Sequence, residues 1–185
     1  MEEFNISEHQ KAPYLELNDY KAPEGIKSYF VNMDDGIKIR VCHWLQKKEK
    51  STGTILLQQG HNEFIEKYYE TIQEFIDRGY SVICFDWRGQ GMSERMIDDI
   101  NKSFINDFKR HDKDLEKILE EIIDPFFPKP LIGIGHSMGG CLMLSAFHNH
   151  PKKFGYGILS APMLGFKNEK FLRTASSLMN FFKKD

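Results

Sequence analysis

The chain has 185 residues, of which 27 are acidic and 25 basic, giving a formal net charge of −2, and 41% of its residues are hydrophobic. This length and composition fit one soluble globular domain with a single sizeable core. The balanced charge offers no basic stripe to neutralise phosphates, which excludes nucleic acid as a partner bound by charge. Any partner is therefore expected to be small and neutral, or recognised by shape.

Three cysteines, Cys42, Cys84 and Cys141, are widely spaced among apolar neighbours. Their number and spacing provide neither a disulfide framework nor a CxxC metal pair, so we expect reduced, buried thiols. The first ten residues lack the apolar segment of a signal peptide, and no stretch approaches the roughly eighteen apolar residues of a membrane span. The sequence therefore predicts a cytoplasmic protein, and we expect no cofactor and no metal.

Two strands are predicted after a polar lead over residues 1–20. Residues 26–33 and 37–45 are strand-like runs, and the Asp35-Gly36 step between them favours the positive φ angles of a tight hairpin. Residues 54–58 form the next predicted strand. Residues 64–78 form a predicted helix with apolar side chains on one face, and Gly79 is its expected C-terminal stop.

Further strand and helix units follow along the chain. A strand over residues 81–85 ends in the glycine-rich loop 86–93. Apolar residues between 105 and 122 mark a helix face interrupted at His111 and Asp112, and prolines end it before a strand over 131–135. A helix over 138–150 and a strand over 156–159 complete the pattern. This alternation predicts an α/β fold, with a mostly parallel sheet covered on both faces and an N-terminal antiparallel hairpin.

The motif G-x-S-x-G occurs at Gly135, Ser137 and Gly139, between a short apolar strand and a helix. A serine at such a sharp turn adopts a strained backbone, and only residues without a Cβ fit two positions on either side. The turn would lift the Ser137 hydroxyl above the sheet and aim the backbone N–H of Met138 at a developing oxyanion. Ser137 is therefore predicted to be the nucleophile of an acyl transfer.

A second oxyanion donor is expected in the loop after an earlier strand. Residues 59–63 follow the 54–58 strand directly, and Gly60 lets the backbone approach a substrate closely. The backbone N–H of His61 is the predicted donor. The alternative role of His61 as a metal ligand or general base lacks a second ligand at helical or hairpin spacing.

A dinucleotide-binding loop is another interpretation of the glycines, because Gly133 and Gly135 also lie at a strand-to-helix junction. The third glycine of that motif would fall on Met138, and no acid follows the next strand to hold a ribose. No lysine follows the glycines as a Walker motif requires. A glycine turn with a purely structural role remains an alternative.

Four motifs together resemble the α/β hydrolases of the lysophospholipase L2 and monoacylglycerol lipase group. They are QGHNEFIEKY at 59–68, DWRGQGMS at 86–93, GHSMGG at 135–140 and SAPM at 160–163. The resemblance covers residues 20–166 and implies an α/β-hydrolase fold and serine hydrolysis of a monoacyl lipid. Gln59 stands where many members carry histidine, which we expect to alter hydrogen bonding in the loop and to leave the donor backbone in place. Another ester, amide or thioester substrate stays open, because the elbow determines only acyl capture.

The catalytic triad of this fold runs in the chain order serine, acid, histidine. After Ser137 the histidines are His148 and His150, and both precede the acids Glu169 and Asp185. At about 1.5 Å per helical residue these histidines lie about 16 to 20 Å from the nucleophile, whereas proton transfer needs about 3 Å. The resemblance implies that relatives continue into a cap, two strands that carry the acid and the histidine, and a last helix. We therefore expect a chain truncated at its C-terminus, inactive or weakly active alone.

The predicted division of the chain is a polar lead at 1–20, a partial hydrolase core at 21–166 and the start of a cap at 167–185. The last segment is a predicted amphipathic helix that would lie on a membrane surface or self-associate, and the strand 156–159 would be an open sheet edge. The expected partners are a monoacyl lipid or other small ester, a membrane contacted peripherally, and a complementing C-terminal polypeptide. The alternative function is a non-catalytic scaffold that binds lipid or a partner.

Overall fold

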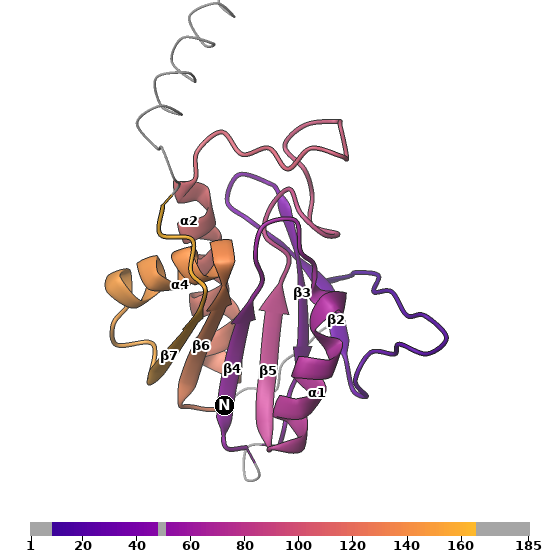
Figure 1. Cartoon of the computed structure of the whole chain (residues 1–185), viewed down its shortest axis with the longest axis vertical. Helices are drawn as coiled ribbons and strands as arrows, with labels where there is room; N and C mark the ends of the chain where they lie inside the picture. The colour runs from indigo at the N-terminus through magenta and orange to yellow at the C-terminus, as the bar shows by residue number, and fades with distance from the viewer. Residues whose placement is uncertain (1–8, 48–50, 166–185) are drawn as a thin grey trace, which may run out of the picture.

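A seven-stranded mixed sheet organises the computed structural model, which describes residues 9–47 and 51–165 (Figure 1). The strands are β1 (Gln10–Lys11), β2 (Lys27–Asn32), β3 (Lys38–Trp44), β4 (Gly53–Gln58), β5 (Tyr80–Phe85), β6 (Leu131–His136) and β7 (Tyr156–Ser160). Their order across the sheet is β1-β2-β3-β5-β4-β6-β7. The pairs among β5, β4, β6 and β7 are parallel, and the pairs from β1 to β5 through β2 and β3 are antiparallel. The predicted fold class is confirmed.

Helices cover both faces of this sheet. They are η3 (Ile65–Tyr68), α1 (Tyr69–Asp77), α2 (Lys109–Ile118), η4 (Leu119–Ile123), α3 (Asp124–Phe126) and α4 (Ser137–Asn149). Along β4, Ile55 and Leu57 pack with Ile72 of α1, whereas Leu56 packs with Leu115 of α2 and Leu142 of α4. Because side chains of a strand alternate between the two faces, β4 is buried from both sides.

The N-terminal hairpin forms as predicted. Gly36 has a φ of 84° in the turn between β2 and β3, and Asn32 pairs with Lys38 beside it. The strand β1, which the polar composition of residues 1–20 does not indicate, adds to this hairpin through Gln10 and Lys11. Its two residues are exposed, so its pairing rests on backbone hydrogen bonds and carries no apolar pattern.

The predicted interruption of the apolar helix face is wrong at His111, which is buried on that face. Helix α2 runs without a break from Lys109 to Ile118. His111 is 2% exposed and packs edge-on against Trp87, with their ring centroids 5.2 Å apart, so it continues the buried face of the helix. Burial lowers the pKa of His111 to about 4, with Arg88 and His61 contributing. A neutral, aromatic histidine therefore continues the buried face of the helix.

The C-terminal edge of the described sheet is open. β7 is the last strand in the sheet order, and Tyr156 and Ile158 on it are 66% and 53% exposed. Cys141 on α4 is half-buried, whereas Cys42 and Cys84 are buried as expected, and all three are free thiols. Across residues 9–47 and 51–165, no helix is long and apolar enough to cross a membrane. The predicted amphipathic helix at 167–185, with Glu169 and Asp185, lies outside the described residues.

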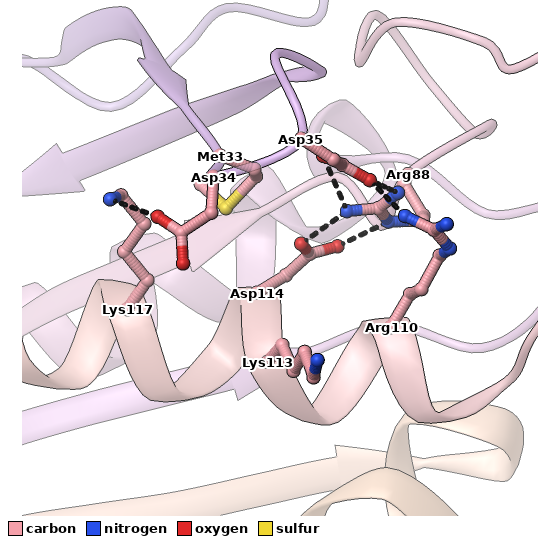
Figure 2. A pocket seen from close by; sticks show the side chains of 8 residues that line it. All are labelled: Met33, Asp34, Asp35, Arg88, Arg110, Lys113, Asp114 and Lys117. Carbon is pink, nitrogen blue, oxygen red and sulfur yellow. Dashed lines mark hydrogen bonds and ion pairs between the residues drawn. The ribbon is translucent and has the colours of Figure 1, made fainter.

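A cluster of charges fastens α2 to the hairpin and to the glycine-rich loop (Figure 2). The buried Arg88 guanidinium donates to Asp114 of α2 at 2.6 Å and to Asp35 of the hairpin turn at 2.8 Å. Arg110 also pairs with Asp35, and Lys117 donates to Asp34 at 2.6 Å. These groups line a pocket of about 200 Å³ in which every carboxylate already has a basic partner. The ion pairs around the pocket therefore hold three segments of the chain together: α2, the hairpin turn and the glycine-rich loop.

Replacing Asp114 with asparagine should lower the free energy of unfolding by about 3 kcal/mol, because the buried Arg88 loses half of its counter-charge. Urea unfolding followed by circular dichroism measures the change. The matched control is Glu74→Gln, which breaks an exposed ion pair with Arg78 on α1 and should cost less than about 0.5 kcal/mol. Equal effects of the two variants would contradict the structural role of the cluster.

Candidate active site

The turn between β6 and α4 has the geometry of a nucleophile elbow. Ser137, the predicted nucleophile, has a φ of 51°, a strained conformation for a residue with a Cβ. A Cβ on Gly135 would lie 2.6 Å from the carbonyl oxygen of Gly139, so the chain reverses too tightly for any other residue there. The N–H of Met163 donates to the Ser137 carbonyl at 2.9 Å and holds the turn from the far side.

The start of α4 packs directly on the loop that follows β4. A Cβ on Gly139 would lie 2.4 Å from the carbonyl oxygen of Gln59 and 2.5 Å from that of Gln58. Real Cβ atoms do not approach so closely, so glycine at 139 lets the helix touch the backbone of residues 58–60. The two predicted oxyanion donors, His61 and Met138, thus belong to segments in direct contact.

The loop itself passes beside the serine. A Cβ on Gly60 would lie 3.1 Å from the Cβ of Ser137, which is the close approach that the sequence predicts for this glycine. The backbone N–H groups of His61 and Met138 donate to no acceptor within the described part of the chain. His61 is exposed and Met138 is 3% exposed. An oxyanion hole requires two such unused donors, and these two belong to the residue after Ser137 and to the loop that passes beside it.

Glu63 closes the loop on itself. Its carboxylate accepts the Gly60 N–H at 2.8 Å, the Tyr68 hydroxyl at 2.6 Å and the Lys67 ammonium at 2.7 Å. Burial would raise the pKa of Glu63, but the hydrogen bonds from Lys67, Tyr68 and the Gly60 N–H outweigh it and lower the pKa to about 2. The carboxylate is therefore ionised at neutral pH and fixes the Gly60 peptide that precedes His61.

Asp86 is the centre of a buried hydrogen-bond network beneath the loop. One carboxylate oxygen accepts from the Gln59 amide at 3.2 Å and the Ile65 N–H at 3.1 Å. The other accepts from the Met92 N–H at 2.8 Å and from Arg40 Nε at 2.8 Å. Burial raises the pKa of Asp86 to about 6, and the Arg40 guanidinium opposes that rise. At neutral pH the pair is charged, and it joins four segments of the chain.

The network explains what Gln59 does in place of histidine. Its side-chain amide donates to the Phe85 carbonyl at 2.9 Å as well as to Asp86, and its own carbonyl accepts from Trp87 Nε1 at 3.0 Å. Gln59 is 1% exposed, so these bonds tie the start of the loop to β5 and the segment after it. Gln59 thus fastens the loop through both its side chain and its backbone carbonyl.

Gln90 and Gly91 also shape the site, although the sequence motif around them does not indicate their contacts. Gln90 accepts a hydrogen bond from the Asn62 N–H through its side-chain oxygen, and its amide nitrogen lies 4.0 Å from Met138 Sδ. Gly91 has a φ of 51°, and a Cβ there would lie 2.2 Å from Asp86 Cγ. The glycine-rich loop 86–93 therefore supports the site by close packing on Asp86.

Within the described residues, no histidine or acidic side chain is hydrogen-bonded to Ser137 as a catalytic triad requires. No side chain in residues 9–47 and 51–165 hydrogen-bonds to the Ser137 hydroxyl. His148 and His150 lie at the far end of α4, as the sequence predicts, and the His136 ring contacts the Ser160 carbonyl at 3.2 Å. Within the same ranges no three histidine, cysteine or acidic side chains gather as a metal site.

The sequence of the chain matches a family of hydrolases and several curated relatives. The family model described as serine aminopeptidase, S33 matches residues 49–184. Lysophospholipase L2 of Escherichia coli is 27% identical over 136 residues, which cover 74% of this chain and 39% of that protein. Monoglyceride lipase of Rattus norvegicus is 26% identical over 178 residues, covering 93% of this chain and 52% of that protein. The chain thus spans about half, or less, of the length of these curated relatives.

Solved structures share the fold. A thermostable carboxyl esterase from Bacillus coagulans superposes with a TM-score of 0.69 at 20% identity, covering 87% of this chain and 52% of that one. The thioesterase domain from the curacin biosynthetic pathway superposes with a TM-score of 0.66 at 22% identity, covering 86% and 52%. The described sheet and helices therefore correspond to about half of an α/β-hydrolase fold.

The stabilising effect of Glu63 should depend on pH. Because folding lowers its pKa from 4.5 to about 2, the carboxylate stabilises the protein fully above pH 4.5, and this contribution is lost as the pH falls toward 2. The difference in unfolding free energy between wild type and Glu63→Gln, measured in urea from pH 7 to pH 2, should shrink over that window. Glu70→Gln, an exposed change on α1, serves as the control. A difference that stays constant down to pH 2 would contradict the assignment.

Proposed function

The chain belongs to the serine aminopeptidase S33 family, and on this premise we propose that it forms the nucleophile-bearing part of an esterase acting on monoacyl lipids. One observation carries the proposal. Ser137 lies at a strained turn with its Cβ 3.1 Å from the Cβ position of Gly60, and the backbone N–H groups of His61 and Met138, next to these two residues in the chain, have no acceptor in the described chain. That arrangement suits the capture of an acyl group and the stabilisation of the charge that develops on its carbonyl oxygen.

In the proposed reaction the Ser137 oxygen attacks the ester carbonyl carbon and passes its proton to a general base. The carbonyl oxygen becomes an oxyanion that accepts hydrogen bonds from the backbone N–H groups of His61 and Met138. As the tetrahedral intermediate collapses, the ester bond breaks and the alcohol leaves with the proton. Water then attacks the acyl–Ser137 ester and passes a proton to the same base. The acid product leaves, and Ser137 regains its proton.

The general base is proposed to come from a segment that corresponds to the part of the relatives beyond the matched region. Two facts support this: no described side chain hydrogen-bonds to the Ser137 hydroxyl, and the relatives are about twice as long as the matched region. Without an imidazole, a serine hydrolase loses on the order of 10⁶ in kcat. Residues 1–185 without such a segment are therefore proposed to be inactive or weakly active.

A monoacyl lipid is the proposed substrate class because two relatives are named a lysophospholipase and a monoglyceride lipase. The protein is proposed to act in the cytoplasm, with a peripheral contact to the membrane that supplies the lipid. The alternative, a non-catalytic scaffold, makes the same fold and differs in that Ser137 forms no acyl-enzyme.

Chemical rescue tests this proposal with the 185-residue chain itself. Free imidazole should replace the missing base, so that p-nitrophenyl octanoate acylates Ser137 faster as the imidazole concentration rises. The acyl-enzyme is detected by mass spectrometry and p-nitrophenol release by absorbance. Ser137→Ala should remove both signals down to the imidazole background, whereas Ser145→Ala on the same helix should leave them unchanged.

Two results would contradict the proposal. Equal p-nitrophenol release by wild type and Ser137→Ala at every imidazole concentration would favour the non-catalytic scaffold. Rapid Ser137-dependent turnover without imidazole would show that the base lies in this chain.

A further inference from the structure

A second pocket adjoins the loop that carries His61. It holds about 250 Å³, and its polar lining comes from Asn62, Glu63, Gln90, Arg95, Asn101 and Ser103. Asn62 is two residues from Gly60, so its Cα is at most about 7 Å from that of Gly60. Gln90 spans from the Asn62 N–H toward Met138 Sδ. Two of the lining residues, Asn62 and Gln90, therefore lie beside the segments that carry the proposed oxyanion donors.

Arg95 brings an uncompensated positive charge into this pocket. Its Nε donates to the Ile100 carbonyl at 2.9 Å, and its Nη1 donates to the carbonyls of Gly91 and Ser93 at 3.2 and 3.3 Å. Throughout residues 9–47 and 51–165, no carboxylate pairs with this guanidinium and no acceptor engages its Nη2. The three backbone acceptors hold the group in place without neutralising it.

The one acidic group in the lining is already balanced. The Glu63 carboxylate accepts hydrogen bonds from the Lys67 ammonium, the Tyr68 hydroxyl and the Gly60 N–H. The Lys67 ammonium balances its charge. The remaining polar groups are the amides of Asn62, Gln90 and Asn101 and the hydroxyl of Ser103, which are all donors, and the Asn101 amide also hydrogen-bonds to Asp99. The lining therefore suits an anion that also carries hydroxyl or ester oxygens.

We propose that this pocket binds the phosphodiester head group of a monoacyl phospholipid while its ester carbonyl lies at Ser137. Arg95 Nη2 donates to a phosphate oxygen, and the neighbouring amides contact the glycerol oxygens. Charge-assisted bonds from arginine to phosphate are short and strong, so Arg95 discriminates in favour of phospholipids over neutral monoacylglycerols. The inference rests on the proposed function for its substrate and names the head group that the function leaves open.

Binding of head-group fragments tests the pocket without any turnover. Sn-glycerol 3-phosphate, glycerol and inorganic phosphate are titrated into the 15N-labelled chain, and amide shifts are followed by nuclear magnetic resonance. Glycerol 3-phosphate should shift the Asn62 and Asn101 amides and bind at least tenfold more tightly than either glycerol or inorganic phosphate. Arg95→Gln should weaken that binding at least tenfold, and Arg78→Gln, an exposed arginine on the surface of the molecule, should leave it unchanged.

A second variant keeps the test independent of the hydrogen bonds that Arg95 makes to the loop. Asn101→Asp places a negative charge in the pocket and leaves Arg95 intact, and it should weaken glycerol 3-phosphate binding at least fivefold. Three outcomes would overturn the proposal: glycerol binding as tightly as glycerol 3-phosphate, inorganic phosphate alone binding equally well, or unchanged affinity in a folded Arg95→Gln or Asn101→Asp. Because no ester is cleaved, these outcomes are separate from a failure of acylation at Ser137.

Discussion

The buried Asp86 carboxylate is the interaction on which the rest of this structure depends. A charge that is 0% exposed is tolerable only when it is paired and hydrogen-bonded, and Asp86 obtains its donors from four separate segments. Arg40 comes from β3, Gln59 from the end of β4, Ile65 from the start of η3 and Met92 from the glycine-rich loop. Moving any one of these segments would leave a buried charge or donor unsatisfied. The carboxylate thereby sets their relative positions.

The loop of the proposed oxyanion hole is one of those segments, and it is restrained at both ends. Gln59 and Ile65 bind Asp86, Glu63 binds the Gly60 N–H, and Gly139 lets α4 pack on the carbonyls of residues 58 and 59. An oxyanion hole lowers a barrier only if its donors are oriented before the charge appears, because their reorientation would otherwise consume the gain. Restraint by buried bonds supplies that orientation before any substrate binds.

The sequence predicts those features that depend on residues close together along the chain. The G-x-S-x-G turn, the Asp35-Gly36 hairpin and the amphipathic α1 are local patterns, and all three are present. The Asp86 network is not local: Arg40 lies 46 residues away and Gln59 27 residues away, so no spacing rule connects them. The sequence predicts a gap in the apolar helix face at His111, and the gap is absent because His111 packs on Trp87, which only the folded chain brings to it.

Amide hydrogen exchange in an Asp86→Asn variant tests most directly whether this carboxylate positions the loop. The account predicts that the Ile65 and Met92 amides, which donate to Asp86, lose at least about tenfold more protection than the Leu56 amide in the centre of β4. A uniform loss of protection at all three amides, or no loss at Ile65 and Met92, would contradict it.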